Sequence, residues 1–382
     1  MHSIADLRSR ARRRLPRVVF DFIDGGAGDE TALADNQAAF RRLRMVPRVF
    51  RACRNRELAC TLLGQRYALP FGVTPMGLCN LAWPGTDAAL ARVCAQAQIP
   101  YALSTMASTD IETIAALAPG HVWFQLYIGG DAALAQSLLA RAEAAGIRTL
   151  VLSVDANFPA RRLRDRRNGF ALPLRPSVRL AADLLSHPAW SLCTLAAGTP
   201  GFANFVARAG ASTLPISAML QSLAQAQIDW QTLEQARARW PHRLIVKGVL
   251  HPQDAERIRA LGADAIVVSN HGARQWAGVP ATIDVLPAIR AAVGDDFALI
   301  LDSGVRSGDD IVKALAAGAD FVLLGRAFLY ATAALGAQAG AAAAIEILRA
   351  ELDTALAQLG CASLPALRAE QFFQALQPGA SR

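Results

Sequence analysis

The chain has 382 residues, of which 53% are hydrophobic and 18% charged, so it can bury a large core and is too apolar for a disordered protein. The formal net charge is +8, but no element interleaves basic and aromatic side chains, which argues against a nucleic-acid partner. The six cysteines form no C-x-x-C pair and no zinc-type spacing, so we expect no metal site and a reducing, cytoplasmic location.

A basic, partly helical segment comes first, and residues 1–17 contain no apolar run of the kind found in a signal peptide. Eight short apolar runs follow and are predicted to be strands. They are 69–74, 99–103, 121–127, 149–154, 244–249, 265–269, 298–301 and 321–324.

Amphipathic helical stretches lie between most of these runs. Examples are 131–145, 252–261 and 309–317, which end at Gly146, Gly262 and Gly318, residues suited to a helix C-cap. Strands that alternate with helices pair in parallel. Eight such units predict an α/β fold with a closed (β/α)8 TIM barrel, and an open doubly wound sheet is the alternative. We expect a single domain over 1–382, with the barrel at about 69–345 and a long insertion after strand 4 at about 170–228.

The insertion has an unusual composition. Between Asp183 and Asp229 the one fully charged residue is Arg208, and prolines and glycines interrupt the apolar run, so a straight membrane-spanning helix is not expected. Two interpretations remain open. The segment 184–220 packs against the barrel or a neighbouring subunit, or it forms a peripheral membrane contact, which the basic flank 161–167 would favour on anionic lipid.

Polar residues follow nearly every predicted strand, at the end of a parallel barrel where active sites lie. They are Ser104, Gln125, Tyr127, Ser153, Asp155, Lys247, Asn270, His271, Asp302 and Arg326.

Two glycine-containing loops follow the last two strands, DSGVRSG at 302–308 and LGR at 324–326. Phosphate sites in barrels are commonly built from these loops, because free backbone amides and a guanidinium match phosphate oxygens. A phosphorylated ligand or cofactor is therefore expected.

The segment SNHGARQ at 269–275 places His271 three residues before Arg274. Histidine is suited to general-base work near neutral pH, and arginine pairs bidentately with a carboxylate. Asp155 is expected to orient the imidazole and support its positive charge. Lys247, one of two lysines in the chain, would either form a Schiff base or stay charged and stabilise an anion, for example the reduced ring if the ligand were a flavin.

These segments resemble the FMN-dependent α-hydroxy-acid dehydrogenase and oxidase family. The matching stretches run in order along nearly the whole chain: FDFIDGGA at 20–27, QLY at 125–127, SVD at 153–155, VKG at 246–248, SNHGARQ at 269–275, DSGVR at 302–306 and GR at 325–326. TPMG at 74–77, WP at 83–84, HPAW at 187–190 and the long insertion most resemble the mandelate and L-lactate dehydrogenase branch.

The resemblance implies FMN as cofactor and an L-2-hydroxy acid, mandelate-like or lactate, as a substrate that is oxidised to the 2-oxo acid. His271 would accept a proton, whether the substrate carbon loses a proton or a hydride, with Asp155 and Lys247 beside it. Arg162, Arg274, Tyr127 and position 22 would contact the substrate. The residues implied for the cofactor are Pro75, Met76, Gly77, Ser104, Gln125, Ser153, Lys247, Asp302, Ser303, Gly304, Arg306, Gly325 and Arg326.

One residue departs from the family pattern: Phe22 stands where the family usually has a tyrosine that hydrogen-bonds the substrate. Losing one neutral hydrogen bond is worth on the order of 1 kcal/mol, so we expect altered substrate handling in a working enzyme. The alternatives are a flavin-binding protein with impaired turnover and an oxidase that uses oxygen. The resemblance further implies a quinone or similar electron acceptor, a homo-oligomer, and peripheral contact with the inner face of the cell membrane.

Overall fold

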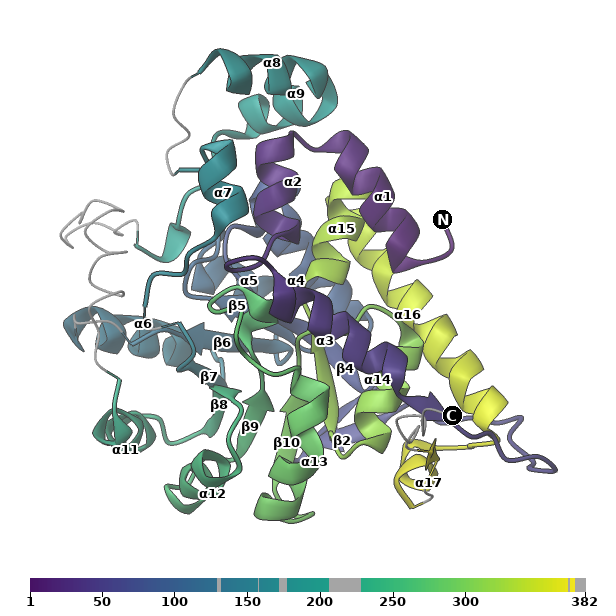
Figure 1. Cartoon of the computed structure of the whole chain (residues 1–382). Helices are drawn as coiled ribbons and strands as arrows, with labels where there is room; N and C mark the ends of the chain where they lie inside the picture. Colours follow the sequence, from purple (N-terminus) through teal and green to yellow (C-terminus); the bar gives the residue numbers. More distant parts are fainter. Residues whose placement is uncertain (129–131, 157, 172–176, 206–227, 370–371, 375–382) are drawn as a thin grey trace.

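The computed structural model describes residues 1–128, 132–156, 158–171, 177–205, 228–369 and 372–374. Eight parallel strands close into a barrel in the order β10-β11-β4-β5-β6-β7-β8-β9 (Figure 1). Pairing between β11 and β4 completes the barrel, so the predicted barrel is confirmed and the open sheet is excluded. The strands are β4 (Phe71–Met76), β5 (Tyr101–Ser104), β6 (Val122–Leu126), β7 (Thr149–Ser153), β8 (Arg243–Val249), β9 (Ala265–Val268), β10 (Ala298–Leu301) and β11 (Phe321–Leu324).

Aromatic side chains fill the amino-terminal end of the barrel. Tyr67 comes from a hairpin of β2 (Cys60–Leu62) and β3 (Gln65–Tyr67), and its ring centroid lies 5.5 Å from that of Phe321. The indole of Trp123 donates a hydrogen bond of 3.2 Å to the Tyr67 hydroxyl. This packing leaves the carboxyl ends of the strands as the place for a site.

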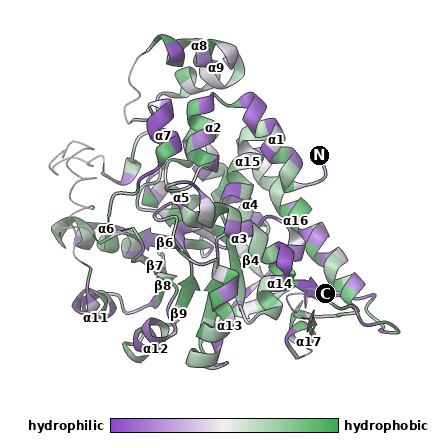
Figure 2. Ribbon diagram, viewed as in Figure 1, coloured by the Kyte–Doolittle hydropathy of each residue, from purple (hydrophilic) through white to green (hydrophobic). Residues whose placement is uncertain are grey.

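Helices form the outer layer, and Figure 2 shows hydrophilic residues on α11 and α12 and hydrophobic residues along the barrel strands. Gly146, Gly262 and Gly318 follow α6, α12 and α14 with φ values of 83°, 83° and 113°, a left-handed backbone that glycine adopts without a Cβ clash. The expected helix ends are therefore confirmed, although Asp131 lies outside the described residues. The helices of this layer are α4 (Thr86–Gln96), α5 (Ile111–Leu117), α6 (Ala132–Ala144), α11 (Trp230–Arg239), α12 (Pro252–Ala260), α13 (Thr282–Val293), α14 (Gly308–Ala316), α15 (Arg326–Leu335) and α16 (Ala337–Leu359).

The amino-terminal segment folds as α1 (Ile4–Arg14), α2 (Arg17–Asp24) and α3 (Thr31–Arg42), as expected for a partly helical start. α1 packs against α15, and the Arg14 guanidinium donates to the Ala334 carbonyl at 2.9 Å. The first and last parts of the chain meet where β1 (Arg44–Met45) pairs antiparallel with β12 (Phe373–Gln374), after the short helix α17 (Leu364–Ala369).

The insertion between β7 and β8 contains α7 (Leu163–Asn168), α8 (Val178–Ser186), α9 (Pro188–Ala197) and the short helix η2 (Ala203–Phe205). Trp190 of α9 is buried and donates its indole N–H to the Leu81 carbonyl at 2.9 Å, which attaches α9 to the loop after β4. The outer sides of α8 and α9 carry exposed apolar side chains, including Val178, Leu185 and Leu195.

Both interpretations of the segment 184–220 thus have support in the part of it that is described, and residues 206–220 lie outside the described residues. Among the helices that the structure describes, none combines the length and apolar character needed to cross a bilayer.

Candidate active site

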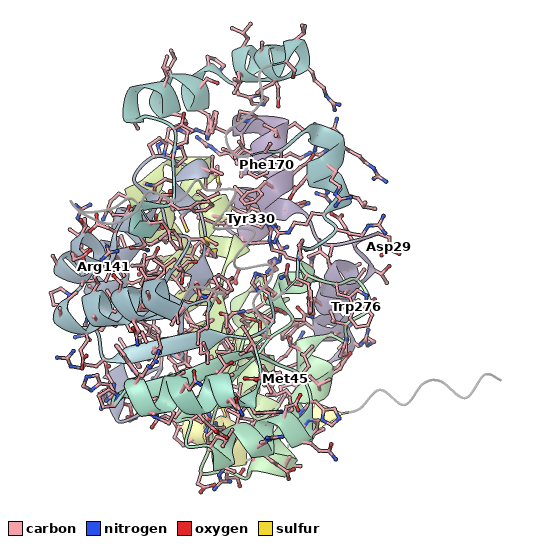
Figure 3. The ribbon with its side chains drawn as sticks, turned by 90° about the vertical axis from the view of Figure 1, so that its left-hand side faces the viewer. Asp29, Met45, Arg141, Phe170, Trp276 and Tyr330 are labelled. Carbon is pink, nitrogen blue, oxygen red and sulfur yellow. The ribbon has the colours of Figure 1, made fainter. Side chains whose placement is uncertain are left out.

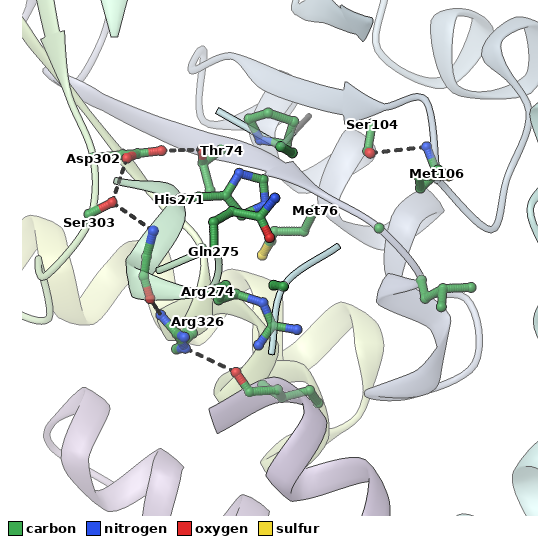
Figure 4. A pocket seen from close by; sticks show the side chains of 18 of the residues that line it. Thr74, Met76, Ser104, Met106, His271, Arg274, Gln275, Asp302, Ser303 and Arg326 are labelled. Atoms are coloured by element: carbon green, nitrogen blue, oxygen red, sulfur yellow. Dashed lines mark hydrogen bonds between the residues drawn. The ribbon is translucent and has the colours of Figure 1, made fainter. Parts of the chain in front are cut away.

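A cavity of about 770 Å³ opens at the carboxyl ends of the barrel strands, within the usual size of small-molecule sites (Figure 4). It brings together most of the predicted site residues. Those on its wall are Phe22, Pro75, Met76, Gly77, Ser104, Tyr127, Arg162, Lys247, His271, Arg274, Asp302, Ser303, Gly304, Arg306, Gly325 and Arg326.

Three predicted residues lie behind this wall. Ser153 is buried on β7, where it pairs with Lys247 of β8. Asp155 contacts Lys247 and His271, as described below. Gln125 is fully buried, and its Oε1 accepts from the Ser104 hydroxyl at 3.1 Å, while its Nε2 finds no partner among the described residues.

Asp155 joins His271 to Lys247. Its Oδ1 lies 3.0 Å from Nδ1 of His271, and its Oδ2 lies 3.4 Å from Nζ of Lys247. Burial alone would raise the pKa of Asp155, but the charge of Lys247 and the hydrogen bond from His271 outweigh it and hold this pKa well below its usual range. Because an ionised carboxylate only accepts hydrogen bonds, we assign the imidazole proton to Nδ1, which leaves Nε2 able to take up a proton.

Lys247 carries a fixed positive charge in this cluster. Its Nζ lies 2.8 Å from the Ser269 hydroxyl and 3.4 Å from Oδ2 of Asp302. Burial lowers the pKa of Lys247, but Asp155 and Asp302 together raise it above its ordinary value. Of the two sequence-based alternatives, the geometry favours the stable charge over the neutral amine that a Schiff base requires.

His271 stands on a tight turn. His271, Gly272 and Ala273 all have positive φ, at 57°, 63° and 57°. Two amide side chains hold this turn from behind: Nδ2 of Asn270 donates to Oδ1 of Asn36 at 2.7 Å, and Nδ2 of Asn36 donates back at 3.0 Å. Burial lowers the pKa of His271, so the ring is neutral near pH 7 and ready to act as a base.

Two half-buried arginines, Arg162 and Arg274, face the same cavity. Arg274 donates to the Phe22 carbonyl at 2.6 Å and the Gly25 carbonyl at 3.0 Å, and Arg162 donates to the Arg274 carbonyl at 3.3 Å. Burial, and then the neighbouring charges of Arg162 and Arg326, lower the pKa of Arg274 well below its ordinary value. An anion between these guanidiniums would stabilise their charged forms and so offset the lowered pKa, as expected for a carboxylate site.

An aromatic pair forms the apolar side of the cavity. The rings of Phe22 and Phe170 stack with centroids 4.3 Å apart and planes 11° apart, and the Arg274 guanidinium lies 5.0 Å from the Phe22 ring. Phe170 comes from the insertion and lies between the α8–α9 pair and the barrel (Figure 3). The sequence analysis did not single out Phe170.

Close packing of the two phosphate-type loops leaves no space for a side chain at their glycines. A Cβ on Gly325 would come within 2.9 Å of the Thr74 side chain, and Gly304 has φ of 96° with no space for a Cβ beside the Asn36 carbonyl. The unpartnered Nε2 of Gln125 requires an acceptor. A flavin supplies ring carbonyl oxygens, so this buried donor fits the expected FMN.

The sequence led us to expect the Arg326 guanidinium at a phosphate, but in the structure it bonds the backbone. It donates to three backbone carbonyls, Ile23 at 3.0 Å, Gly272 at 3.0 Å and Gly25 at 2.8 Å. The backbone of Arg326 begins α15, so a helix amino terminus still faces this side of the cavity.

Comparisons with known proteins agree with the geometry. A sequence profile described as FMN-dependent dehydrogenase matches residues 11–374. (S)-Mandelate dehydrogenase of Pseudomonas putida is 38% identical over 367 residues, which cover 96% of this chain and 92% of that protein. L-Lactate dehydrogenase of Caulobacter vibrioides is 39% identical over 361 residues, 94% of each chain.

Solved structures show the same likeness. A crystal structure described as that of the monotopic membrane protein (S)-mandelate dehydrogenase superposes with a TM-score of 0.93 at 38% identity, covering 98% of this chain and 99% of the other. A structure of mandelate oxidase gives a TM-score of 0.82 at 36% identity, over 97% and 98% of the two chains.

Proposed function

Because this chain belongs to the FMN-dependent dehydrogenase family, we propose that it oxidises an L-2-hydroxy acid with an aromatic or other large apolar side chain to the corresponding 2-oxo acid. The observation that carries this proposal is the convergence of His271, bonded to Asp155, with two half-buried arginines in one cavity. The family is FMN-dependent, and FMN, when bound, would supply the acceptor for the two electrons that leave the substrate carbon.

Arg162 and Arg274 bind the substrate carboxylate, which turns the carbon bearing the hydroxyl toward His271. Charge-assisted bonds of this kind are about twice as strong as neutral ones, so they orient the substrate. Tyr127 lines the cavity beside them, and burial raises its pKa to about 12, so its hydroxyl keeps its proton and can donate to substrate oxygen.

His271 takes up a proton on Nε2 during the oxidation. Asp155 then faces an imidazolium through Nδ1–H and stabilises it, in the role that a carboxylate plays in a nucleophile triad. Lys247 keeps the largely buried Asp155 ionised and supplies a fixed positive charge at the cavity wall.

The apolar wall supports an aromatic substrate over lactate. Phe22 and Phe170 stack there, and Met106 and Ile128 also line the cavity. Because Phe22 replaces the usual tyrosine, an apolar ring lies beside the arginines proposed to bind the carboxylate. The Arg274 guanidinium packs against the face of this ring. We therefore infer that Phe22 alters substrate preference in a competent enzyme, and that impaired turnover is the less supported alternative.

The proposal extends to the electron acceptor and to the location of the protein in the cell. The exposed apolar side chains of α8 and α9 and the monotopic relative support peripheral membrane contact, where a quinone would reoxidise the enzyme. Association into a homo-oligomer is part of this proposal.

The test begins with an absorbance spectrum of the purified protein. (S)-Mandelate and L-lactate are then added separately without oxygen. Bleaching of the flavin band by mandelate, more efficient than by lactate, is the expected result. Slow recovery of colour in air and fast recovery with a soluble quinone would support the dehydrogenase over the oxidase. A flavin band that neither acid bleaches, in this protein and in Phe22→Tyr, would refute the proposed activity.

A further inference from the structure

We propose that Arg326 is a positioning residue for the substrate carboxylate, and that it acts on Arg274 through the Gly25 carbonyl, which accepts hydrogen bonds from both guanidiniums. This inference rests on the proposed role of Arg274 in binding the carboxylate. It assigns the side chain of Arg326 a task separate from holding the cofactor phosphate.

The shared carbonyl is the central observation. The Gly25 oxygen lies 2.8 Å from one terminal nitrogen of Arg326 and 3.0 Å from one of Arg274. Arg326 is buried and Arg274 is half-buried, and both lie at the cavity wall. A shift of Gly25 would therefore move a hydrogen-bond partner of the substrate arginine.

The two arginines together cap the carboxyl end of α2. Arg274 takes the carbonyls of Phe22 and Gly25, and Arg326 takes those of Ile23 and Gly25. The last carbonyls of a helix lack partners within it and carry the negative end of its dipole, so cations are stabilised there. Without Arg326, the end of α2 would lose two of these donors, and Arg274 would lose the anchor that sets its direction.

Arg326 also connects this helix end to the His271 turn. It donates to the Gly272 carbonyl, and the Gly272 amide donates to the Ser303 hydroxyl at 2.9 Å. Ser303 donates to Asp302 at 2.8 Å, and Asp302 accepts from Thr74 of β4 at 2.9 Å (Figure 4). One chain of hydrogen bonds thus runs from β4, past the turn that carries His271, to Arg326, which positions Arg274.

Arg306 is the better placed of the two loop arginines to hold a phosphate. Among the described residues its guanidinium has one hydrogen-bond partner, the Val305 carbonyl at 2.7 Å, and it lines the cavity. Most of its N–H groups are available, whereas each nitrogen of Arg326 already donates to a carbonyl.

The experiment compares Arg326→Gln with Arg306→Gln and Arg274→Gln. The FMN dissociation constant is measured by reconstituting the apoprotein. Phenylacetate, an aryl carboxylate without an oxidisable hydroxyl, and its neutral amide are then titrated into FMN-saturated protein, with the change in the flavin spectrum as the readout.

For Arg326→Gln we expect phenylacetate binding to weaken about tenfold or more, with phenylacetamide binding and FMN affinity each within about threefold of the wild type, as for loss of a hydrogen bond to a charged group. In turnover, the same variant should raise KM more than it lowers kcat. Arg306→Gln should show the opposite pattern, with weakened FMN binding and normal phenylacetate binding once saturated.

The inference is overturned if Arg326→Gln weakens FMN as much as Arg306→Gln does while phenylacetate binds normally. Normal phenylacetate binding by Arg274→Gln would instead overturn the proposed carboxylate role of Arg274, a separate failure. Should Arg326→Gln not fold, Arg326→Lys decides, because it keeps the charge and part of the carbonyl contacts. It should weaken phenylacetate binding by a smaller factor, and unchanged binding would count against the inference.

Discussion

The carboxylate of Asp155 bonds the imidazole of His271 at 3.0 Å with one oxygen and lies 3.4 Å from the Lys247 ammonium with the other. A single buried anion thus orients the base and is itself kept ionised by the lysine. The proton-accepting role proposed for His271 depends on both contacts.

We expect Asp155→Asn to lower the rate of anaerobic flavin reduction by roughly 10²- to 10⁴-fold, the range typical of general-base catalysis, because the imidazolium loses its counterion. Rapid mixing with (S)-mandelate measures this rate. Asp353→Asn, which removes a carboxylate paired with Arg56 outside the cavity wall, serves as the matched control and should react at the wild-type rate. A rate for Asp155→Asn within threefold of the control would rule out the assigned role.

The acid limb of kcat/KM should lie below pH 6.5, the ordinary pKa of histidine, because burial lowers the pKa of His271 more than Asp155 raises it. His271 is active when neutral, so activity falls as pH drops through its pKa. Asp155, Lys247 and Arg162 are the charged groups that act on it. In Asp155→Asn the limb should move to still lower pH, since the group that raises the pKa is removed. A wild-type limb above pH 6.5 would contradict this assignment.

The aromatic pair should control substrate preference. Phe170→Leu removes a stacked partner of Phe22, and aromatic pairs contribute about 0.5–1.5 kcal/mol beyond burial, so the kcat/KM ratio of mandelate to lactate should fall by about two- to tenfold. Phe22→Tyr adds a hydroxyl to this apolar wall and should lower the same ratio, by raising kcat/KM about fivefold for lactate, the value of one neutral hydrogen bond, and by less for mandelate. If Phe170→Leu changed kcat/KM equally for the two acids, the Phe22–Phe170 pair would not discriminate between substrate side chains.

The unpartnered side-chain amide of Gln125 predicts that a substitution there changes FMN affinity selectively. Gln125→Glu keeps the Oε1 that accepts from Ser104 and replaces the donating Nε2 with an acceptor. FMN should bind at least about fivefold more weakly, since a buried acceptor left facing an acceptor costs about 1–3 kcal/mol. Fluorescence titration of the apoprotein measures this affinity, with Gln65→Glu on the β2–β3 hairpin as a control that should bind FMN normally.

Asn36→Ala should separate positioning of the base from stability. It leaves the buried amide of Asn270 with fewer partners, which costs about 1–3 kcal/mol in the free energy of unfolding. Asn80→Ala removes one side-chain hydrogen bond, which Asn80 accepts from the Asp87 amide and which involves no residue of the His271 turn, and should also lose stability. We expect a lower rate of flavin reduction for Asn36→Ala and an unchanged rate for Asn80→Ala, measured where both proteins are fully folded.

Much of the barrel and of its site could be predicted from sequence, because parallel strands are continuous apolar runs and the barrel collects the residues that follow them at one end. Asp155, Lys247, His271 and Asp302 were found for that reason. Asn36 was missed because its partner is 234 positions away and no local period connects them. An asparagine on the buried side of α3, beside Ala32, Ala39 and Phe40, was the available signal.

Phe170 was missed, and the backbone partners of the Arg326 side chain were not foreseen, for a related reason. Phe170 belongs to the insertion, whose path over the cavity follows from contacts between α2 and α7 and not from any repeat. The position of Arg326 after the last strand correctly places it at the cavity, but its guanidinium turns to carbonyls of α2, about 300 positions earlier in the chain.

The large sequence separation of the contacts made by the first three helices has a consequence for folding during synthesis. Arg14 bonds Ala334, Asp24 bonds Tyr330, and Phe40 bonds Lys313, so α1 to α3 find their partners at separations of 320, 306 and 273 residues. At about 5–20 residues per second, the ribosome needs roughly 15–60 s to supply those partners. During that interval Leu7, Val19 and Phe40, buried in the finished protein, have no barrel to cover them. Nascent chains arrested before α15 should therefore engage chaperones through their first 42 residues.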